Sequence, residues 1–273
     1  MISVVIPMFN SKKTIAECIN SVVNQTREDL IGEIIVIDDG SADGSAELVE
    51  CRYSSYKKLR VIRKRNEGVS SARNMGIKAA KYDWIALLDS DDVWLLHKIE
   101  LQWMQIQNRP DIRFIGGNRN NENVRWGKRI SNELYELDLK HILIKNWPHT
   151  STALIRADVF REIGLFNRNM RYAEDGDMWN RIACKYPLYY IPKSMEIAGE
   201  NKVQFGECGL SADLKQMHKG NIRNISVLKK QGMISFPFYF FLKIYNDIKY
   251  VRRIFITRKE KLKKKYEKYI GIL

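Results

Sequence analysis

The chain has 273 residues, of which 45% are hydrophobic and 29% are charged. This is the composition of a soluble globular protein, and the length suits one large α/β domain with an appendage. Its four cysteines, at positions 18, 51, 184 and 208, show no C-x-x-C spacing. Their scatter argues against a zinc site or a disulfide framework and for a reducing compartment. Without a secretory signal, or the roughly 18 apolar residues of a spanning helix, the sequence predicts a cytoplasmic protein.

The net charge of +14 is concentrated at the C-terminal end. From Lys215 to Leu273 there are 16 Lys or Arg residues against three acids, so the rest of the chain is nearly neutral. The basic character therefore belongs to this segment and not to a chemical site. A nucleic-acid-binding protein would fit the pI, but no nucleic-acid recognition module is apparent, so we expect no nucleic-acid partner.

Short apolar runs alternate with amphipathic stretches through the first 110 residues. This rhythm predicts parallel strands joined by helices in a doubly wound sheet with right-handed crossovers. Gly76 weakens the helix expected over residues 68–80. The predicted strands cover residues 2–6, 33–37, 59–63 and 82–88.

The rhythm breaks after Pro110. We expect a helix over residues 132–145, another over 175–185, and a helical, basic segment from Asp213 onward. That last segment includes the aromatic run Phe236-Pro237-Phe238-Tyr239-Phe240-Phe241.

The apolar run Trp84–Leu88 stops at three carboxylates within four residues, Asp89, Asp91 and Asp92. Ligands of open α/β sheets bind at the carboxyl ends of such strands. Carboxylates this close repel unless a cation lies between them, and hard oxygen ligands favour Mg²⁺ or Mn²⁺. The cluster predicts a metal site for a phosphate-bearing substrate, although an acidic N-cap for the next helix is the alternative.

Four further motifs accompany this cluster in a fixed order. They are Pro7-Met8-Phe9-Asn10, Asp38-Asp39-Gly40-Ser41, the stretch from Asn66 to Asn74 with its N-x-G-x-x-x-A-R-N pattern, and Glu174-Asp175. In this order and spacing, the motifs resemble glycosyltransferase family 2, the inverting nucleotide-sugar transferases with a GT-A fold. The resemblance covers about residues 1–200 and leaves the basic C-terminal segment outside it.

The resemblance implies a nucleotide site. Phe9, in the turn opened by Pro7, would lie against the base, and Asp39 would accept from uracil N3–H. Arg73 would lie along the nucleotide pocket. The alternatives are a core aromatic, an Asx turn with a helix cap, and a solvated arginine, respectively.

The resemblance also implies the reacting groups. Asp91 would be the side-chain ligand of Mn²⁺ or Mg²⁺, and Asp89 would accept from the ribose or share the metal. Asp175 would be the catalytic base that deprotonates the acceptor hydroxyl, and a helix-opening acidic turn is its alternative. Many relatives carry a histidine after the base, but residues 201–206 have none, and Lys202 is a weak substitute. The chain's four histidines lack ligand spacing, so we expect each to be structural; His149 could border the sugar pocket.

These observations predict an inverting, metal-dependent glycosyltransferase that moves a sugar from a UDP-sugar to a saccharide or lipid-linked saccharide in bacterial polysaccharide or lipopolysaccharide synthesis. The GT-A catalytic domain would span residues 1–210, with a nucleotide-binding half to about residue 110 and an acceptor-side half beyond. Residues 211–273 would form a basic helical extension with a peripheral contact to an anionic membrane. A nucleotidyltransferase of similar build is the enzymatic alternative. The sugar, the linkage and the oligomeric state stay open.

Overall fold

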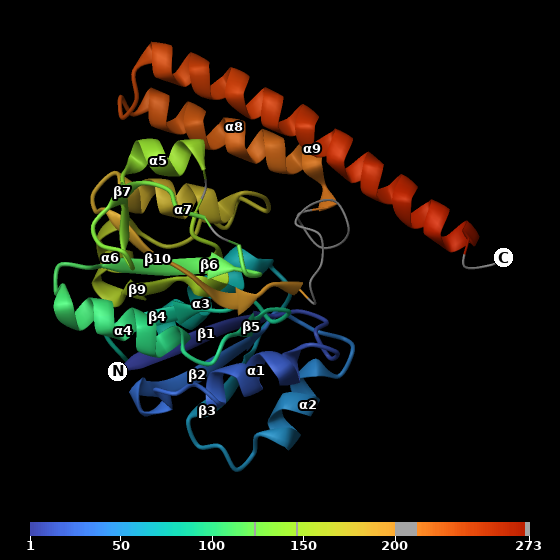
Figure 1. The fold of residues 1–273 in the computed structure, drawn as a ribbon. Helices are drawn as coiled ribbons and strands as arrows, with labels where there is room; N and C mark the ends of the chain where they lie inside the picture. Colours follow the sequence, from blue (N-terminus) through green and yellow to red (C-terminus); the bar gives the residue numbers. More distant parts are fainter. Residues whose placement is uncertain (123, 146, 200–211, 271–273) are drawn as a thin grey trace. The chain divides into compact units, whose positions relative to one another are not determined.

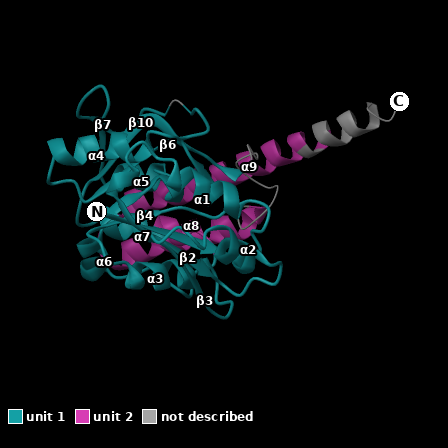
Figure 2. Ribbon diagram, turned by 90° about the horizontal axis from the view of Figure 1, so that it is seen from below, with its two compact units in different colours: residues 1–171, 177–201 teal, residues 172–176, 202–273 magenta. Residues whose placement is uncertain are grey.

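The structure is a computed structural model that describes residues 1–122, 124–145, 147–199 and 212–270, without the side chains of 261 and 263–270. It divides into two compact units (Figure 2). The first comprises Met1–Arg171 with Asp177–Asn201, and the second comprises Tyr172–Gly176 with Lys202–Leu273. No helix of the described residues is long and apolar enough to cross a membrane.

A mixed sheet forms the centre of the first unit (Figure 1). Its strands are ordered β3-β2-β1-β4-β9-β6-β10-β8-β7, and β5 pairs with β10. Strands β3, β2, β1 and β4 are parallel, whereas β9 runs antiparallel between β4 and β6. The strands are β1 Ile2–Met8, β2 Ile31–Asp38, β3 Leu59–Arg63, β4 Trp84–Leu87, β5 Val93–Trp94, β6 Phe114–Arg119, β7 Lys128–Arg129, β8 Tyr135–Leu137, β9 Leu154–Arg156 and β10 Leu188–Ile197.

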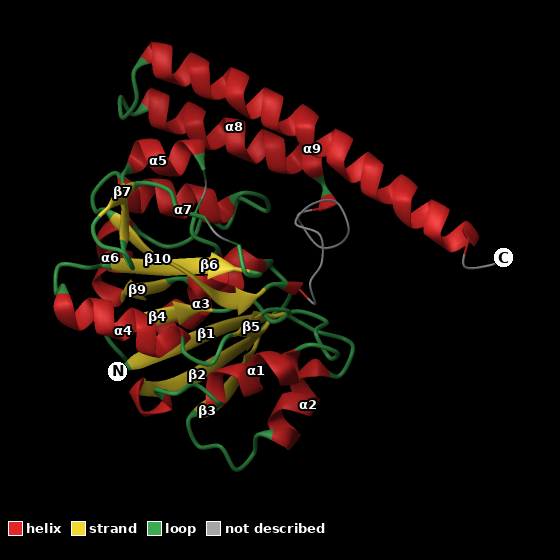
Figure 3. Ribbon diagram, in the orientation of Figure 1, coloured by secondary structure: helices red, strands yellow, loops and turns green. Residues whose placement is uncertain are grey.

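Helices cover both faces of this sheet (Figure 3). Alternate residues of β1 point to opposite faces, as a pleated strand requires: Val4 and Ile6 belong to one core and Val5 to the other. Helices α1 (Ile15–Val23), α2 (Ser45–Arg52) and α4 (Lys98–Asn108) pack in the first core. The second core receives α3 (Val69–Ala79), α5 (Leu139–Ile144), α6 (Ala157–Ile163) and, from Met178 onward, α7 (Glu174–Ala183). The expected α/β fold with helices on both sides of a largely parallel sheet is confirmed.

Helix α3 lies unusually close to the sheet at Gly76. A Cβ atom on Gly76 would be 2.3 Å from Cγ1 of Val5 and 3.3 Å from Cγ1 of Ile37. The glycine that weakens the helix on propensity is therefore required by packing.

The helix expected over residues 132–145 is wrong in its first half. Tyr135–Leu137 forms strand β8 beside β10, and α5 begins only at Leu139. Asp138 caps that helix by accepting from the His141 backbone N–H at 3.0 Å.

In the second unit, helices α8 (Leu214–Lys230) and α9 (Phe236–Ile270) pack side by side. His218 Nε2 of α8 lies 3.0 Å from Asp247 Oδ1, and the His218 ring stacks on Tyr250 with the ring centroids 4.6 Å apart. The hydroxyls of Ser226 and Tyr239 lie 3.3 Å apart. The expected helical, basic C-terminal extension is confirmed.

Candidate active site

The predicted nucleotide residues of the first unit gather at one edge of the sheet. Strands β1, β2 and β4 are parallel neighbours, with Met8 opposite Asp38 and Val5 opposite Leu87. Their carboxyl ends therefore bring Phe9, Asp39 and Asp89 to the same edge, where ligands of open α/β sheets bind.

Phe9 is 50% exposed, whereas the seven preceding residues, Pro7 included, are buried. This exposure excludes the alternative that Phe9 is a core aromatic. The turn that carries it is tied to the loop after β2. The Asn10 backbone N–H donates to Ser41 Oγ at 2.9 Å, and Asn10 Oδ1 accepts from the Ala42 N–H at 2.9 Å.

Asp39 directly follows β2 and is buried. Its carboxylate accepts from Lys64 Nζ at 2.6 Å and from the backbone N–H groups of Glu67 and Gly68 at 3.0 and 2.7 Å. Asp38 accepts from the Ser41 N–H at 3.0 Å and so holds its own turn. These bonds fix the orientation of Asp39; a base N–H would have to share its oxygens with the present donors.

Gly68 has a φ of +91°, and nothing lies within 4 Å of the position that a Cβ would occupy. Open space beside the start of α3 suits the close approach of a ligand to the backbone. One turn further, Arg73 is buried, and its Nη2 donates to both carboxylate oxygens of Asp89 at 2.7 and 3.0 Å. The alternative of a solvated Arg73 is thereby excluded, because Arg73 orients and partly neutralises Asp89.

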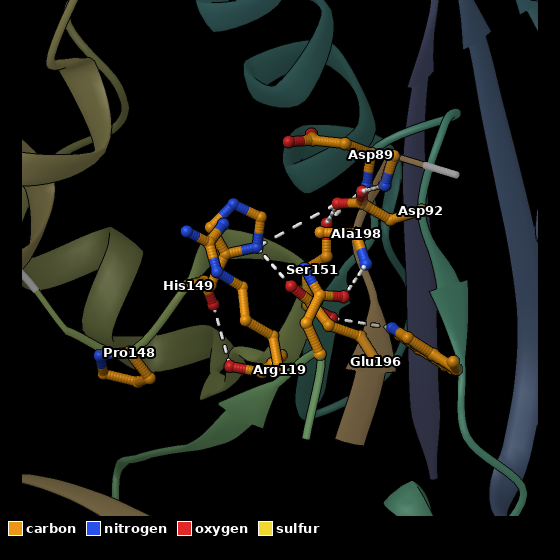
Figure 4. A network of polar contacts seen from close by, with 12 residues as sticks. Asp89, Asp92, Arg119, Pro148, His149, Ser151, Glu196 and Ala198 are labelled. Carbon is orange, nitrogen blue, oxygen red and sulfur yellow. Dashed lines mark hydrogen bonds and ion pairs between the residues drawn. The ribbon is translucent and has the colours of Figure 1, made fainter. Parts of the chain in front are cut away.

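Asp91 and Asp92 have opposite environments. Asp91 is exposed, whereas Asp92 is buried beside His149 and Glu196 (Figure 4). His149 Nδ1 lies 4.0 Å from Asp92 Oδ2 and forms a short ion pair with Glu196 Oε1. These three side chains each offer one ligand atom within 4.8 Å of the others, so they form a group that could hold a metal ion.

Burial and charge shift the protonation of this group. Burial raises the pKa of Asp92 to about 8. The negative charge of Glu196 also raises this pKa, whereas the nearby His149 lowers it. For His149, burial alone would lower the pKa, but the charge of Glu196 and its hydrogen bond outweigh burial and raise the pKa to about 9. Nearby, burial lowers the pKa of Lys98 to about 7 against the attraction of Glu196. His149 is therefore an imidazolium at neutral pH.

The sequence places Asp92 in the acidic cluster but does not indicate its association with His149 and Glu196. The sequence predicts a structural role for His149, and Glu196 belongs to no motif. No local signal could have found them, because they come from three segments that only the sheet brings together. Glu196 reaches His149 because β10 pairs with β6 and crosses to β5.

The predicted base Asp175 lies at the start of α7, in the segment Tyr172–Gly176 that belongs to the second unit. It is partly exposed, and the preceding Ala173 has a φ of +56°. Within this unit, Asn224 Nδ2 of α8 donates to the Ala173 carbonyl at 2.9 Å. Lys202 lies outside the described residues.

Comparison with known proteins identifies the family. The sequence model of glycosyl transferase family 2 matches residues 3–164, so the chain belongs to that family. Among individual proteins, the chain is 30% identical over 195 residues to the glycosyltransferase GlyG of Streptococcus pneumoniae, a match that covers 65% of this chain and 64% of GlyG. An uncharacterized glycosyltransferase of Rickettsia bellii is 32% identical over 205 residues, covering 73% of this chain and 29% of the relative.

Solved structures show the same fold. Staphylococcus aureus TarS in complex with UDP-GlcNAc superimposes with a TM-score of 0.65 at 21% identity, over 82% of this chain and 66% of TarS 1–349. This chain thus matches only part of several relatives: about a third of the glycosyltransferases of Rickettsia bellii, Rickettsia conorii and Rickettsia felis, and somewhat under two thirds of GlyG.

Proposed function

We propose that this protein is an inverting glycosyltransferase that moves a sugar from a UDP-sugar to an acceptor hydroxyl. The observation that carries the proposal is the convergence of Phe9, Asp39 and the Arg73–Asp89 pair at the carboxyl edge of β1, β2 and β4. Membership of glycosyl transferase family 2 and the UDP and UDP-GlcNAc complexes of TarS support a UDP-sugar donor.

In the proposed donor complex, the exposed ring of Phe9 stacks on the uracil, for which a π-face suffices. Asp39 selects uracil by accepting from its N3–H. Asp89, held by Arg73, accepts from the ribose or shares the cation. Asp91 offers an exposed carboxylate, the kind of oxygen ligand with which proteins hold Mn²⁺ or Mg²⁺ alongside substrate phosphates. The divalent cation would neutralise the charge that develops on the departing diphosphate.

We further propose Asp175 as the base that removes the acceptor proton while the hydroxyl attacks the anomeric carbon. Replacing Asp175 with Asn preserves the side-chain shape but removes the proton acceptor, which typically costs about 10²–10⁴-fold in turnover. UDP affinity should be almost unchanged, because the base faces the acceptor. Loss of UDP binding in a folded Asp175→Asn protein would move Asp175 to the donor site.

The proposed acceptor is a saccharide or a lipid-linked saccharide of a bacterial surface polysaccharide. Similarity to GlyG and to an Escherichia coli chondroitin synthase, 28% identical over 217 residues, supports a carbohydrate acceptor. For the domains, we propose a catalytic domain over residues 1–210 followed by the helical extension.

We propose that α9 rests on an anionic membrane surface, where a lipid-linked acceptor would lie. On the side of α9 away from its α8 contacts, exposed apolar side chains recur every three or four residues. They are Phe241, Ile244, Ile248, Val251 and Phe255. Exposed Arg252, Arg258 and Lys259 lie close to this stripe, and each basic residue near anionic lipid contributes about 1 kcal/mol.

Sedimentation with liposomes tests this contact. The protein should bind vesicles containing phosphatidylglycerol, bind less as salt increases, and lose binding when Ile248 and Phe255 are both changed to Gln. A control with Leu96→Gln and Met104→Gln, two exposed apolar residues of the first unit, should bind like the wild type. Equal binding to neutral vesicles, or none, would refute the membrane proposal.

A donor screen tests the catalytic proposal. Nucleotide sugars are incubated with candidate saccharide acceptors, released nucleoside diphosphate is measured, and the anomeric configuration of the product is determined by NMR. UDP-sugars should be consumed with inversion. Release of pyrophosphate, which a nucleotidyltransferase would form, or a product of retained configuration would contradict the proposal.

A further inference from the structure

Asp92, His149 and Glu196 come from three separate segments and meet in the interior of the first unit (Figure 4). Glu196 is fully buried, and the Asp92 and His149 side chains are only 6% and 27% exposed. The second carboxylate oxygen of Glu196, Oε2, has no hydrogen-bond partner in the described part of the chain. A buried carboxylate such as that of Glu196 is stable only with a cation beside it.

The imidazole of His149 occupies that position. Its Nδ1 is the atom that approaches both Glu196 Oε1 and Asp92 Oδ2. A positive charge there compensates the Glu196 carboxylate, and the position of the ring between Glu196 and Asp92 links the end of β10 to the loop after β4.

From Asp92 the connection continues to the predicted metal-binding loop. The Asp92 carboxylate accepts from the Ser151 hydroxyl and from the Gly199 backbone N–H at 3.0 Å. Ser151 Oγ in turn accepts from the backbone N–H of Asp89 at 3.0 Å. A continuous series of contacts therefore runs from Glu196 through His149, Asp92 and Ser151 to the backbone of Asp89.

We propose that His149 is a positioning residue: paired with Glu196 and in contact with Asp92, it holds the loop of Asp89 and Asp91 in the geometry that receives the divalent cation and the diphosphate. The inference deepens the proposed function and rests on it. His149 touches neither substrate nor cation in this account and acts through Asp92 and Ser151.

Two variants break the connection at different points. His149→Gln removes the charge, whereas Ser151→Ala leaves the His149–Glu196 ion pair and removes only the hydroxyl that reaches the Asp89 N–H. The matched control is His97→Gln, because His97 also pairs with a glutamate, Glu100 at 2.8 Å, but its side chain is 60% exposed. Hydrogen exchange is measured by mass spectrometry, and UDP binding is measured as Mn²⁺ is titrated.

In both variants, amide exchange in the peptide covering residues 88–95 should become faster by about tenfold or more, while peptides of β1 and β2 stay unchanged. The Mn²⁺ concentration for half-maximal UDP binding should rise severalfold, with little change in UDP binding without metal. The control should match the wild type. Should His149→Gln fail to fold, Ser151→Ala alone decides.

Unchanged exchange in residues 88–95, or a uniform increase throughout the protein with unaltered Mn²⁺ dependence, would overturn the proposal. A stoichiometric metal ion in the purified wild type that is lost in His149→Gln would also overturn it, because a metal would then join the carboxylates. If the wild type binds no UDP, the proposed function fails, but locally faster exchange in both variants would still support the positioning of the loop.

Discussion

Phe9, directly after β1, is placed to bind a ligand and not to fill the core. It directly follows a fully buried strand, yet half of it is exposed beside the turn that carries Asp39. An aromatic ring that stays in water contributes little to the free energy of folding, so we expect Phe9 to act in ligand binding.

Replacing Phe9 with Ala should therefore weaken UDP binding by about 1–3 kcal/mol, the usual contribution of a base stacked on an aromatic ring. The free energy of unfolding should change by less than about 0.5 kcal/mol, as for other exposed sites. Calorimetric titration with UDP and urea denaturation provide the two measurements, and Phe9→Tyr, which keeps the ring, is the control. A large loss of stability with unchanged UDP affinity would show that Phe9 has a structural role instead.

His149 gives a pH-dependent prediction. The charged groups around His149 are Glu196, Asp92 and Arg119, and Lys98 lies on the other side of Glu196. Together, burial and these charges raise the pKa of His149 from its ordinary value of 6.5 to about 9. Because the folded state holds this proton more tightly, the stabilisation that His149 provides is complete below about pH 6.5 and is lost as the pH rises through about 9.

The difference in unfolding free energy between the wild type and His149→Gln should accordingly be large at pH 6 and shrink by pH 9.5. Urea denaturation of both proteins at several pH values measures it, and comparing two proteins that differ at one site cancels the titration of unrelated groups. A difference that grows with pH would mean that His149 is neutral in the folded state.

The sequence could predict those site residues that belong to a recognised motif or that directly follow a predicted strand. Phe9, Asp39 and Asp89 follow parallel strands, and parallel strands necessarily end at one edge. Arg73 belongs to the N-x-G-x-x-x-A-R-N motif. The ion pair of His149 with Glu196 could not be predicted, because it depends on the register of β10 with β6 and on its irregular pairing near Ser194.

At the scale of elements, the alternating first half was predictable because each strand and helix shows its own periodicity. The segment 132–145 was not, because its strand β8 is only three residues long and gains its hydrogen bonds from β10, distant in sequence. Three residues are too few for a pattern of alternation to be distinguished from a helical turn.

At Gly76 in α3, helix propensity and side-chain packing favour different residues. Replacing a helical glycine with alanine normally stabilises by about 1 kcal/mol. Here the added methyl group would press on Val5, so Gly76→Ala should instead lower the free energy of unfolding by about 1–3 kcal/mol. Urea denaturation measures this change, with Lys78→Ala on the exposed side of α3 as the control. A more stable Gly76→Ala protein would mean that α3 can move away from β1 at little cost.

In the whole molecule, the concentration of basic residues at the C-terminal end indicates a segment distinct from the rest of the chain. Helices α8 and α9 form most of a second compact unit. The sequence did not indicate that Tyr172–Gly176, with the predicted base, would belong to it. That association arises from contacts such as Asn224 with Ala173, which join residues far apart in the chain.

In the proposed function, the carboxyl edge of β1, β2 and β4 binds a UDP-sugar with a divalent cation at Asp91. Calorimetric titration of UDP with Mn²⁺ and with EDTA, for the wild type, Asp91→Asn and the exposed-carboxylate control Asp83→Asn, tests it most directly. We expect EDTA to weaken UDP binding to the wild type and to Asp83→Asn by at least about tenfold, or about 1.4 kcal/mol. Asp91→Asn should bind weakly with or without Mn²⁺. Equal UDP affinity with Mn²⁺ and with EDTA, or full Mn²⁺ dependence in Asp91→Asn, would contradict it.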